Sequence, residues 1–173
     1  MASPYFAASG PRSLNSRPTA ALKKLDALIA ASPSNPYIHE FRGEVLLKLH
    51  KASDSVKAFD KALKLDRSKS GLIRARLGVA LMATGDKRQI ERAVGELAAA
   101  LQSDPDNLDA YLSLSQAYGA SGDIGNAELS MAEGNYRAGN VRQAQIFAAR
   151  ALTRLPQKSP GARRANDILT IGK

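Results

Sequence analysis

The sequence contains no cysteine and no tryptophan, and aromatic residues make up only 5% of it. The absence of cysteine excludes disulfide bonds, thiolate nucleophiles and cysteine-ligated zinc. No apolar run approaches the roughly 18 residues that a membrane-spanning helix needs, and the opening MASPYFAASG lacks a basic region and an apolar core. The sequence therefore predicts a soluble chain without an export signal. Alanine and leucine dominate while β-branched residues are scattered singly, which favours an all-α fold.

The formal net charge of +9 is unevenly distributed along the chain. Residues 1–70 carry 12 basic and 6 acidic side chains, residues 71–125 carry 5 and 7, and residues 126–173 carry 8 and 3. Because both ends are basic, one alternative function is that of a solenoid that binds nucleic acid or an anionic membrane surface. The sequence shows neither a contiguous phosphate-neutralising surface nor aromatic platforms for single strands, so nucleic acid is not the favoured partner.

The two histidines do not form a metal site. His39 begins the segment HEFRG, in which Gly43 stands where the second ligand of an H-E-x-x-H zinc motif would be. His39 and His50 would lie about 16 Å apart along a helix, too far for one ion. The sequence also lacks an activated-nucleophile constellation. We therefore expect a protein that is not an enzyme and that needs no metal and no cofactor, with His39 at a packing position and His50 in a turn.

Apolar residues recur at spacings of three and four from Leu22 onward, which predicts amphipathic helices. Seven breaker segments, from SPSNP at 32–36 to PQKSPG at 156–161, divide this pattern into about eight antiparallel helices, the last of which caps the array. Residues 1–18 are predicted to be a flexible lead, because they mix proline, serine and glycine without a period. A helix at 19–31 follows it, without a partner helix before it.

The helices repeat in pairs. Small residues in the first helix of each pair are followed, three positions on, by bulky ones, and the second helix carries a small residue four positions before a bulky one. The small first-helix residues are Gly43, Gly78 and Ser115; the second-helix pairs are Ser55 with Phe59, Ala93 with Leu97, and Ala127 with Met131. This pattern resembles the tetratricopeptide repeat (TPR), which has a period of about 34 residues. The resemblance implies an α-solenoid with repeats at about 36–67, 70–104 and 107–155 and a terminal helix at 159–171. The helix from Asn126 to Ala138 is predicted to close the third repeat and to open a fourth.

Residues 20 to about 170 resemble, more specifically, the C-terminal TPR domain of bacterial zinc metallopeptidases of the cell envelope. The segments that carry this resemblance are NPYIHEFRGEVLL, GLIRARLGVALMATGD, the stretch from AVGELAAALQSDP to the half-repeat AEGNYRAGN, and SPGARRANDIL, with SPYF at 3–6 as a weaker match. The peptidase domain with its zinc site is absent from this sequence. The resemblance implies a periplasmic, non-catalytic accessory domain that binds outer-membrane assembly components, substrates or a peptidase domain.

The first helices of TPR repeats line the inner surface of the solenoid, and partner segments bind there. In this sequence the resemblance assigns that groove to Tyr37, Glu40, Glu44, Leu47, Leu72, Val79, Met82, Leu112 and Gln116. The basic residues with which chaperone-type TPR domains hold a C-terminal carboxylate are missing, apart from Arg76. We therefore expect a protein or peptide partner that is held by an apolar strip rimmed by polar side chains. Salt dependence distinguishes this function from phosphate binding, whose affinity falls steeply with added salt.

Overall fold

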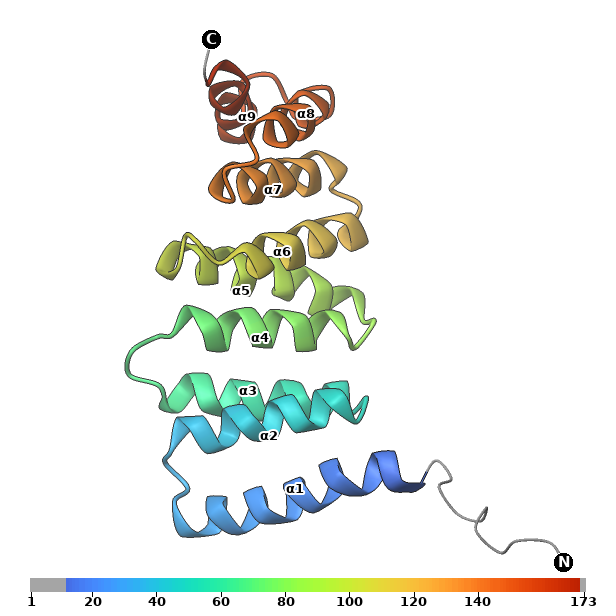
Figure 1. The fold of residues 1–173 in the computed structure, drawn as a ribbon, viewed down its shortest axis with the longest axis vertical. Coiled ribbons are helices and arrows are strands. Elements are labelled where there is room, and N and C mark those ends of the chain that lie inside the picture. The colour runs from blue at the N-terminus through green and yellow to red at the C-terminus, as the bar shows by residue number, and fades with distance from the viewer. Residues whose placement is uncertain (1–11, 172–173) are drawn as a thin grey trace, which may run out of the picture.

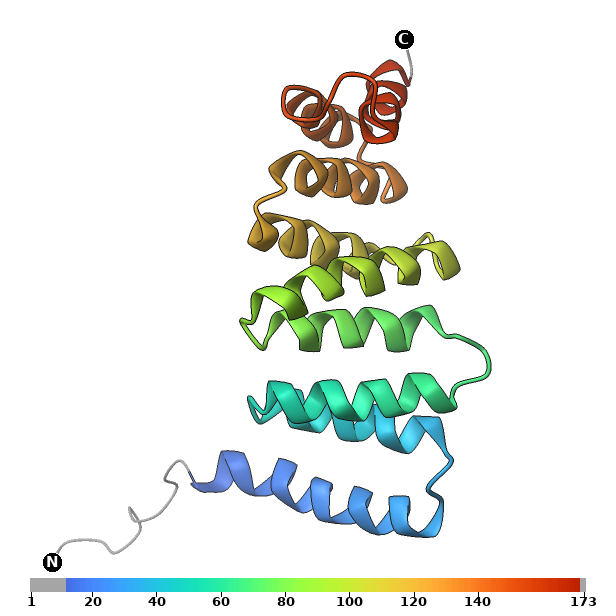
Figure 2. The ribbon, with the colours of Figure 1, turned by 180° about the vertical axis from the view of Figure 1, so that it is seen from behind.

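The computed structural model describes residues 12–171, which form nine α-helices and no strand. The helices follow one another in a single stack, with α1 and α9 at opposite ends (Figure 1), and Figure 2 shows the same stack from behind. Their bounds are α1 Arg12–Ala31, α2 Pro36–Lys48, α3 Ala52–Leu65, α4 Gly71–Met82, α5 Lys87–Ser103, α6 Leu108–Ser121, α7 Ile124–Arg137, α8 Val141–Leu152 and α9 Pro160–Thr170. The predicted all-α solenoid is confirmed.

Two boundaries differ from the prediction. Helix α1 begins at Arg12 rather than at residue 19 and contains Pro18, whose fixed φ is compatible with a helix although its N–H is missing. Residues 1–11 of the predicted lead, including the SPYF motif, lie outside the described residues. The structure has nine helices rather than about eight, because the breaker segments do not include the turn between α2 and α3, which contains neither glycine nor proline. His50 forms that turn with a φ of 57°, a conformation that glycine usually supplies, so the predicted place of His50 in a turn is confirmed.

Short polar residues begin most of the helices. The side chains of Asn35, Asp86, Asn107, Asp123 and Ser159 each accept a hydrogen bond from a backbone N–H in the first turn of the helix that follows. These bonds satisfy donors that have no partner within the helix. The breaker segments of the sequence therefore end one helix and also start the next.

Glycine residues, which have no side chain, allow paired helices to approach closely. A Cβ atom on Gly43 of α2 would lie 2.8 Å from the ring of Phe59 in α3, and one on Gly78 of α4 would lie 2.5 Å from Cγ of Leu97 in α5. The hydroxyl of Ser55 is fully buried at the first of these contacts and donates a 2.8 Å hydrogen bond to the carbonyl oxygen of Gly43. Gly43 and Gly78 are small first-helix residues of the repeat pattern, and the close approach of the paired helices explains why a small residue stands at each position.

The buried side chains form two separate clusters. One runs from Val56 to Ala117 and includes Phe59, Leu77, Leu81 and Leu97, and the other runs from Ala132 to Ile168 and consists mainly of alanines. The division falls between α6 and α7. Each helix packs against its neighbours in the chain, and α2 with α4, α4 with α6, and α7 with α9 also touch. The molecule is therefore held together by contacts between near neighbours, as repeat arrays are.

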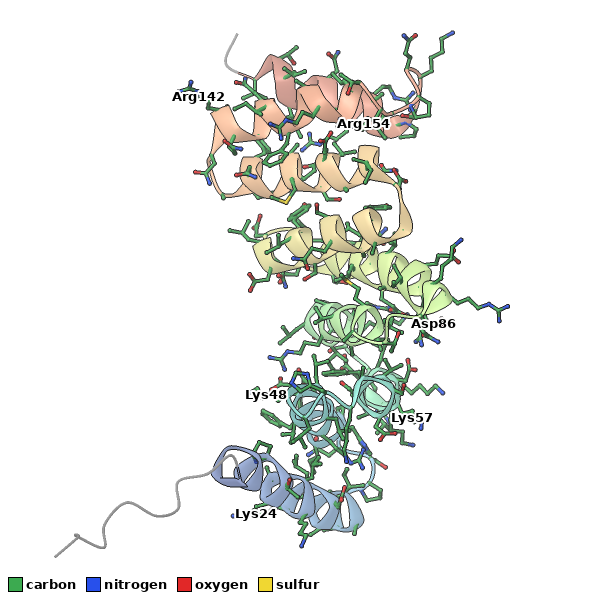
Figure 3. The ribbon with its side chains drawn as sticks, turned by 90° about the vertical axis from the view of Figure 1, so that its right-hand side faces the viewer. Lys24, Lys48, Lys57, Asp86, Arg142 and Arg154 are labelled. Atoms are coloured by element: carbon green, nitrogen blue, oxygen red, sulfur yellow. The ribbon has the colours of Figure 1, made fainter. Side chains whose placement is uncertain are left out.

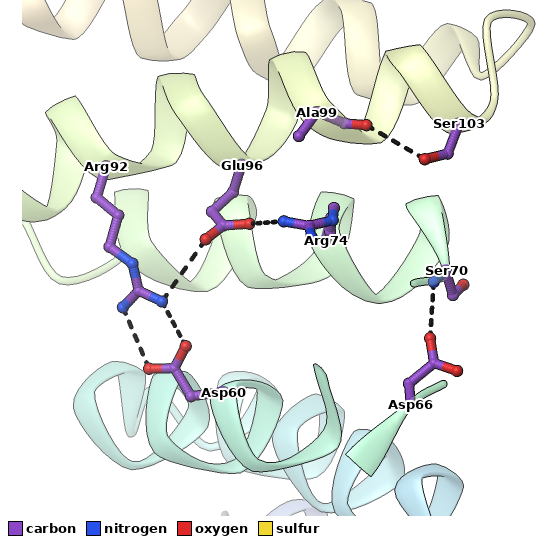
Figure 4. Close-up of polar contacts among 8 residues, drawn as sticks. All are labelled: Asp60, Asp66, Ser70, Arg74, Arg92, Glu96, Ala99 and Ser103. Carbon is purple, nitrogen blue, oxygen red and sulfur yellow. Dashed lines mark hydrogen bonds and ion pairs between the residues drawn. The ribbon is translucent and has the colours of Figure 1, made fainter. Parts of the chain in front are cut away.

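Ion pairs connect successive helix pairs on the side of the second helices. Figure 4 shows Arg92 of α5 contacting Asp60 of α3 with two nitrogens, while Glu96 of α5 accepts a 2.7 Å hydrogen bond from Arg74 of α4. Glu96 also lies 3.7 Å from Arg92. The pKa of Arg92 is raised, mainly by its hydrogen bonds to Asp60. This network joins α5 to both α3 and α4.

Candidate functional site

The first helices α2 and α4 are joined by a three-residue ion-pair network. Arg76 of α4 donates a 2.6 Å hydrogen bond to Oε1 of Glu40 and also contacts the carboxylate of Glu44, both on α2. The side chain of Glu40 is only 9% exposed, whereas those of Glu44 and Arg76 are 27% and 36% exposed. Two carboxylates thus share one guanidinium, so the network carries a formal charge of −1 in a protein whose net charge is +9.

Burial determines the titration of Glu40. Desolvation raises the pKa of Glu40 above its ordinary value of 4.5 and outweighs the opposing effect of Arg76, while Glu44 raises that pKa further. A carboxyl group whose pKa is higher in the folded state makes the protein less stable as the pH rises through that pKa. The network therefore holds α2 against α4 at some cost to stability at neutral pH.

Replacing Glu40 by glutamine should remove this pH dependence, because the amide oxygen still accepts the hydrogen bond from Arg76 while the desolvated charge is gone. We expect the free energy of unfolding of E40Q, relative to the wild type, to increase between pH 4 and pH 7. Urea unfolding of both proteins at the two pH values measures this difference. A wild type that gains stability relative to E40Q as the pH rises would contradict the interpretation.

Large apolar side chains on the first helices are exposed next to this network. Leu72 and Val79 lie four residues before and three residues after Arg76, so they share its face of α4. Leu72 is 48% exposed and Val79 is 39% exposed. Tyr37 of α2 and Leu112 of α6 are 62% and 47% exposed. We call these four side chains, together with Glu40, Glu44, Arg76 and the exposed Gln116, the first-helix face.

Two predicted groove residues do not belong to this exposed surface. Leu47 and Met82 are half-buried and pack against the larger hydrophobic cluster. They lie at the C-terminal ends of α2 and α4. Glu40 is buried as well and therefore supports the face from beneath rather than rimming it. The other predicted groove residues are proposed to form the binding surface: Tyr37, Glu44, Leu72, Val79, Leu112 and Gln116.

Figure 3 places the labelled Lys48, at the end of α2, and Lys57, on α3, on opposite sides of the stack. Both lysines are exposed. The first and second helices of this pair therefore expose separate surfaces to solvent. The ion-pair network of Figure 4 joins α3, α4 and α5, whereas the first-helix face carries four exposed large apolar side chains.

One feature of the site was not anticipated from the sequence. Leu108, at the first position of α6, is 45% exposed and lines an apolar pocket between α6 and α7 together with Leu112 and Met131. The sequence signal for it is the pair of leucines four residues apart that follows DPDN, because the helical period places both side chains on one face of α6.

The histidines have structural places. His39 is 8% exposed, and its Nε2 lies 2.9 Å from the carbonyl oxygen of Pro33 in the turn before α2. This contact is a hydrogen bond that joins α2 to the preceding turn, in agreement with the predicted packing position. Within residues 12–171 no group of three or more potential metal ligands occurs.

The basic C-terminal part of the chain has many of its cations engaged. Arg164 of α9 donates a 2.8 Å hydrogen bond to Glu133 of α7 and lies over the ring of Tyr136, and Arg154 pairs with Glu128 at 3.0 Å. Arg163 is exposed, with a hydrogen bond to the carbonyl oxygen of Lys158. These pairings reduce the charge that this end could offer to phosphates. No helix in the described part of the chain is long and apolar enough to cross a membrane.

Comparison with known proteins supports the same class of fold. Residues 15–71, which include most of α1 and all of α2 and α3, match the family described as tetratricopeptide repeat. No curated protein matches the chain. Among solved structures, MamA is similar with a TM-score of 0.67 at 18% identity, covering 95% of this chain and 92% of MamA. A MamA fragment from Desulfovibrio magneticus RS-1 has a TM-score of 0.66 at 21% identity, covering 94% of this chain and 96% of the fragment.

A third similar structure is that of YrrB, described as a TPR protein with an unusual peptide-binding site. Its TM-score is 0.62 at 18% identity, and the match covers 93% of this chain and 82% of YrrB. The protein described here is therefore an all-α solenoid of the TPR type. TPR repeats generally mediate protein–protein interactions, and their helices serve as binding surfaces rather than as catalytic centres.

Proposed function

We propose that the first-helix face binds a segment of a partner protein and that the protein acts as a non-catalytic interaction module. The observation that carries the proposal is the row of exposed large apolar side chains on three successive first helices, Tyr37 on α2, Leu72 and Val79 on α4, and Leu112 on α6. Apolar side chains collected on one surface of a soluble protein are typical of interaction sites. Each leucine or valine that a partner covers would contribute about 1.5–3 kcal/mol.

The resemblance of residues 20–170 to the TPR domain of envelope metallopeptidases suggests the biological setting of this binding. We propose that the chain is the accessory domain of a periplasmic metallopeptidase and that its partners are outer-membrane assembly components or a peptidase domain. The support for this setting is the set of sequence segments, including the half-repeat at α7, on which that resemblance rests.

Val79→Glu tests the function directly. A carboxylate in a desolvated interface should lower the affinity of a micromolar complex by tenfold or more, because burial of the valine is lost and a charge is buried instead. Binding would be measured by titration with partners captured from an envelope protein fraction. Ile146→Glu is the matched control, since Ile146 is 40% exposed on α8 and lies outside the first-helix face. Circular dichroism should show unchanged helix content in both variants.

The alternative function, binding of nucleic acid or anionic membrane by the basic end, gives the opposite pattern. Arg163→Glu would then abolish binding while Val79→Glu would not, and affinity would fall steeply with salt. That result would contradict the proposed function.

A further inference from the structure

The order of first and second helices changes at α7. Helices α2, α4 and α6 touch one another in turn, as successive first helices do. Helix α8 would be the next first helix if this order continued, yet α6 and α8 do not touch anywhere in the described residues. Helix α7 instead packs against α6, α8 and α9, so it serves as the second helix for α6 and as the first helix for α8. The stacking of α6 directly under α7 is visible in Figure 1.

This change leaves one side of α6 without the neighbour that α2 and α4 have. Leu108 and Leu112, four residues apart on α6, remain 45% and 47% exposed. They form the wall of an apolar pocket of about 180 Å³, whose other side is formed by Met131 of α7 and by Ala138, the residue that follows α7. We call this pocket the α6–α7 notch.

The shape and polarity of the notch are fixed by the packing of its two helices. A Cβ atom on Gly134 of α7 would lie 2.9 Å from Cβ of Tyr111 in α6, so the helices meet closely beside the pocket. Two polar side chains of the lining each donate a hydrogen bond within their own helix, Ser130 to the carbonyl oxygen of Asn126 at 2.9 Å and Asn135 to that of Met131 at 2.8 Å. The notch therefore offers an apolar surface with a fixed outline.

The volume of the notch matches one side chain. Pockets for small-molecule ligands are usually about 300–1,000 Å³, whereas an aliphatic cavity of about 150 Å³ accepts a benzene ring. A single leucine-sized or phenylalanine-sized group therefore fits. Since Leu112 belongs both to the notch and to the first-helix face, a segment bound along that face would reach the notch without leaving the surface of α6.

The rim of the notch is acidic. Asp104, Asp106 and Asp109 lie within the turn that precedes α6 and its first residues, and all three are exposed. Arg137, at the end of α7, pairs with Asp106 at 3.1 Å, and Asp106 remains 83% exposed. The three aspartates and Arg137 give the rim a formal charge of −2, although the protein is basic. A cationic partner segment is the one that it would attract.

We propose that the α6–α7 notch anchors one bulky apolar side chain of a partner segment in which lysine or arginine residues flank that anchor and contact the aspartates of the rim. This proposal rests on the proposed function, because the same segment lies along the first-helix face. It adds the chemistry of the partner, which the exposure of the face alone does not specify.

Selection from a random-peptide display library against the full chain tests the proposal, followed by titration of synthetic copies of the selected peptides. We expect selected peptides that carry net positive charge and a leucine or an aromatic residue between lysines or arginines. Replacement of that anchor by alanine should weaken binding by tenfold or more. Ala138→Trp, which fills the notch from the exposed end of α7, should do the same.

The role of the rim is tested by the double variant Asp106→Asn with Asp109→Asn. We expect affinity to fall severalfold and its salt dependence to flatten. The double variant Asp54→Asn with Asp167→Asn changes the net charge by the same amount at exposed positions away from the notch, and its affinity should stay unchanged. Acidic selected peptides, or equal effects of the two double variants, would overturn the proposed partner chemistry.

A further variant separates this proposal from the proposed function. Leu72→Glu changes the first-helix face on α4, far from the notch in the chain. Peptides that lose affinity for Leu72→Glu and bind Ala138→Trp normally would leave the proposed function intact and refute the notch. Peptides that tolerate both changes, or a selection that enriches no peptide, would refute both.

Discussion

Replacing Phe59 by alanine is expected to lower the free energy of unfolding by about 3–5 kcal/mol, among the largest effects of any single truncation in this protein. The ring of Phe59 is fully buried in the larger hydrophobic cluster and lies against the backbone of α2 at Gly43. Its removal leaves a cavity between α2 and α3 that the two helices cannot close without losing the hydrogen bond from Ser55 to Gly43. Urea or guanidinium unfolding followed by circular dichroism measures the loss.

The same contact predicts that substitutions at positions 43 and 59 are energetically coupled. Gly43→Ala should destabilise the protein by about 1–3 kcal/mol, because its Cβ would overlap the ring of Phe59. The cost should shrink when Phe59 is leucine, which has no ring at that place. Gly95→Ala is the control, since a Cβ on this exposed glycine of α5 meets no atom within 4 Å and should stabilise the helix by roughly 1 kcal/mol. Equal costs of Gly43→Ala in the two backgrounds would contradict this account.

Ile168→Ala is expected to have the second large effect, and a local one. Ile168 is fully buried and is the largest such side chain in the cluster formed by α7, α8 and α9. Loss of its side chain should cost about 2–5 kcal/mol, a large share of what holds the last helix in place. Because the two clusters are separate, the loss should be confined to the C-terminal cluster. Hydrogen exchange should accelerate in α8 and α9 while α3 to α5 keep their protection.

A matched substitution in the other cluster sharpens this test. Leu97→Ala should accelerate exchange in α4 and α5 and leave α9 protected, since Leu97 is fully buried in the larger cluster. Uniform acceleration across all nine helices of residues 12–171 by either variant would show that the two clusters unfold as one unit.

The features that could be predicted from the sequence are those with a local pattern. The pattern predicted small residues in the first helices and bulky residues in the second helices. In the structure Gly43 of α2 meets Phe59 of α3, and Gly78 of α4 meets Leu97 of α5. Periodicity and turn residues sufficed because each repeat packs mainly on its neighbours. The third pair departs from this pattern, since the close approach of α6 and α7 is made by Tyr111 and Gly134.

The features that could not be predicted depend on which side of each helix its neighbours cover. Positional analogy assigned Leu47 and Met82 to the groove, whereas both side chains are half-buried and pack against the larger hydrophobic cluster. The exposure of Leu108 depends on the absence of contact between α6 and α8, which involves residues far apart in the sequence. The start of α1 at Arg12 could not be predicted either, because Pro18 and the mixed composition before residue 19 indicate an irregular segment.

The succession of near-neighbour contacts also determines how this molecule would respond to a pulling force. In the described residues no contact joins α1, α2 or α3 to α7, α8 or α9, so nothing clasps the two ends of the stack together. We expect such a stack to unfold under tension one helix at a time, and each step to release a short piece of chain. Helix α1 would detach first, because none of its described side chains belongs to either buried cluster. We therefore expect the protein to extend easily under force, and a partner bound across α2, α4 and α6 to raise the force needed to separate these helices.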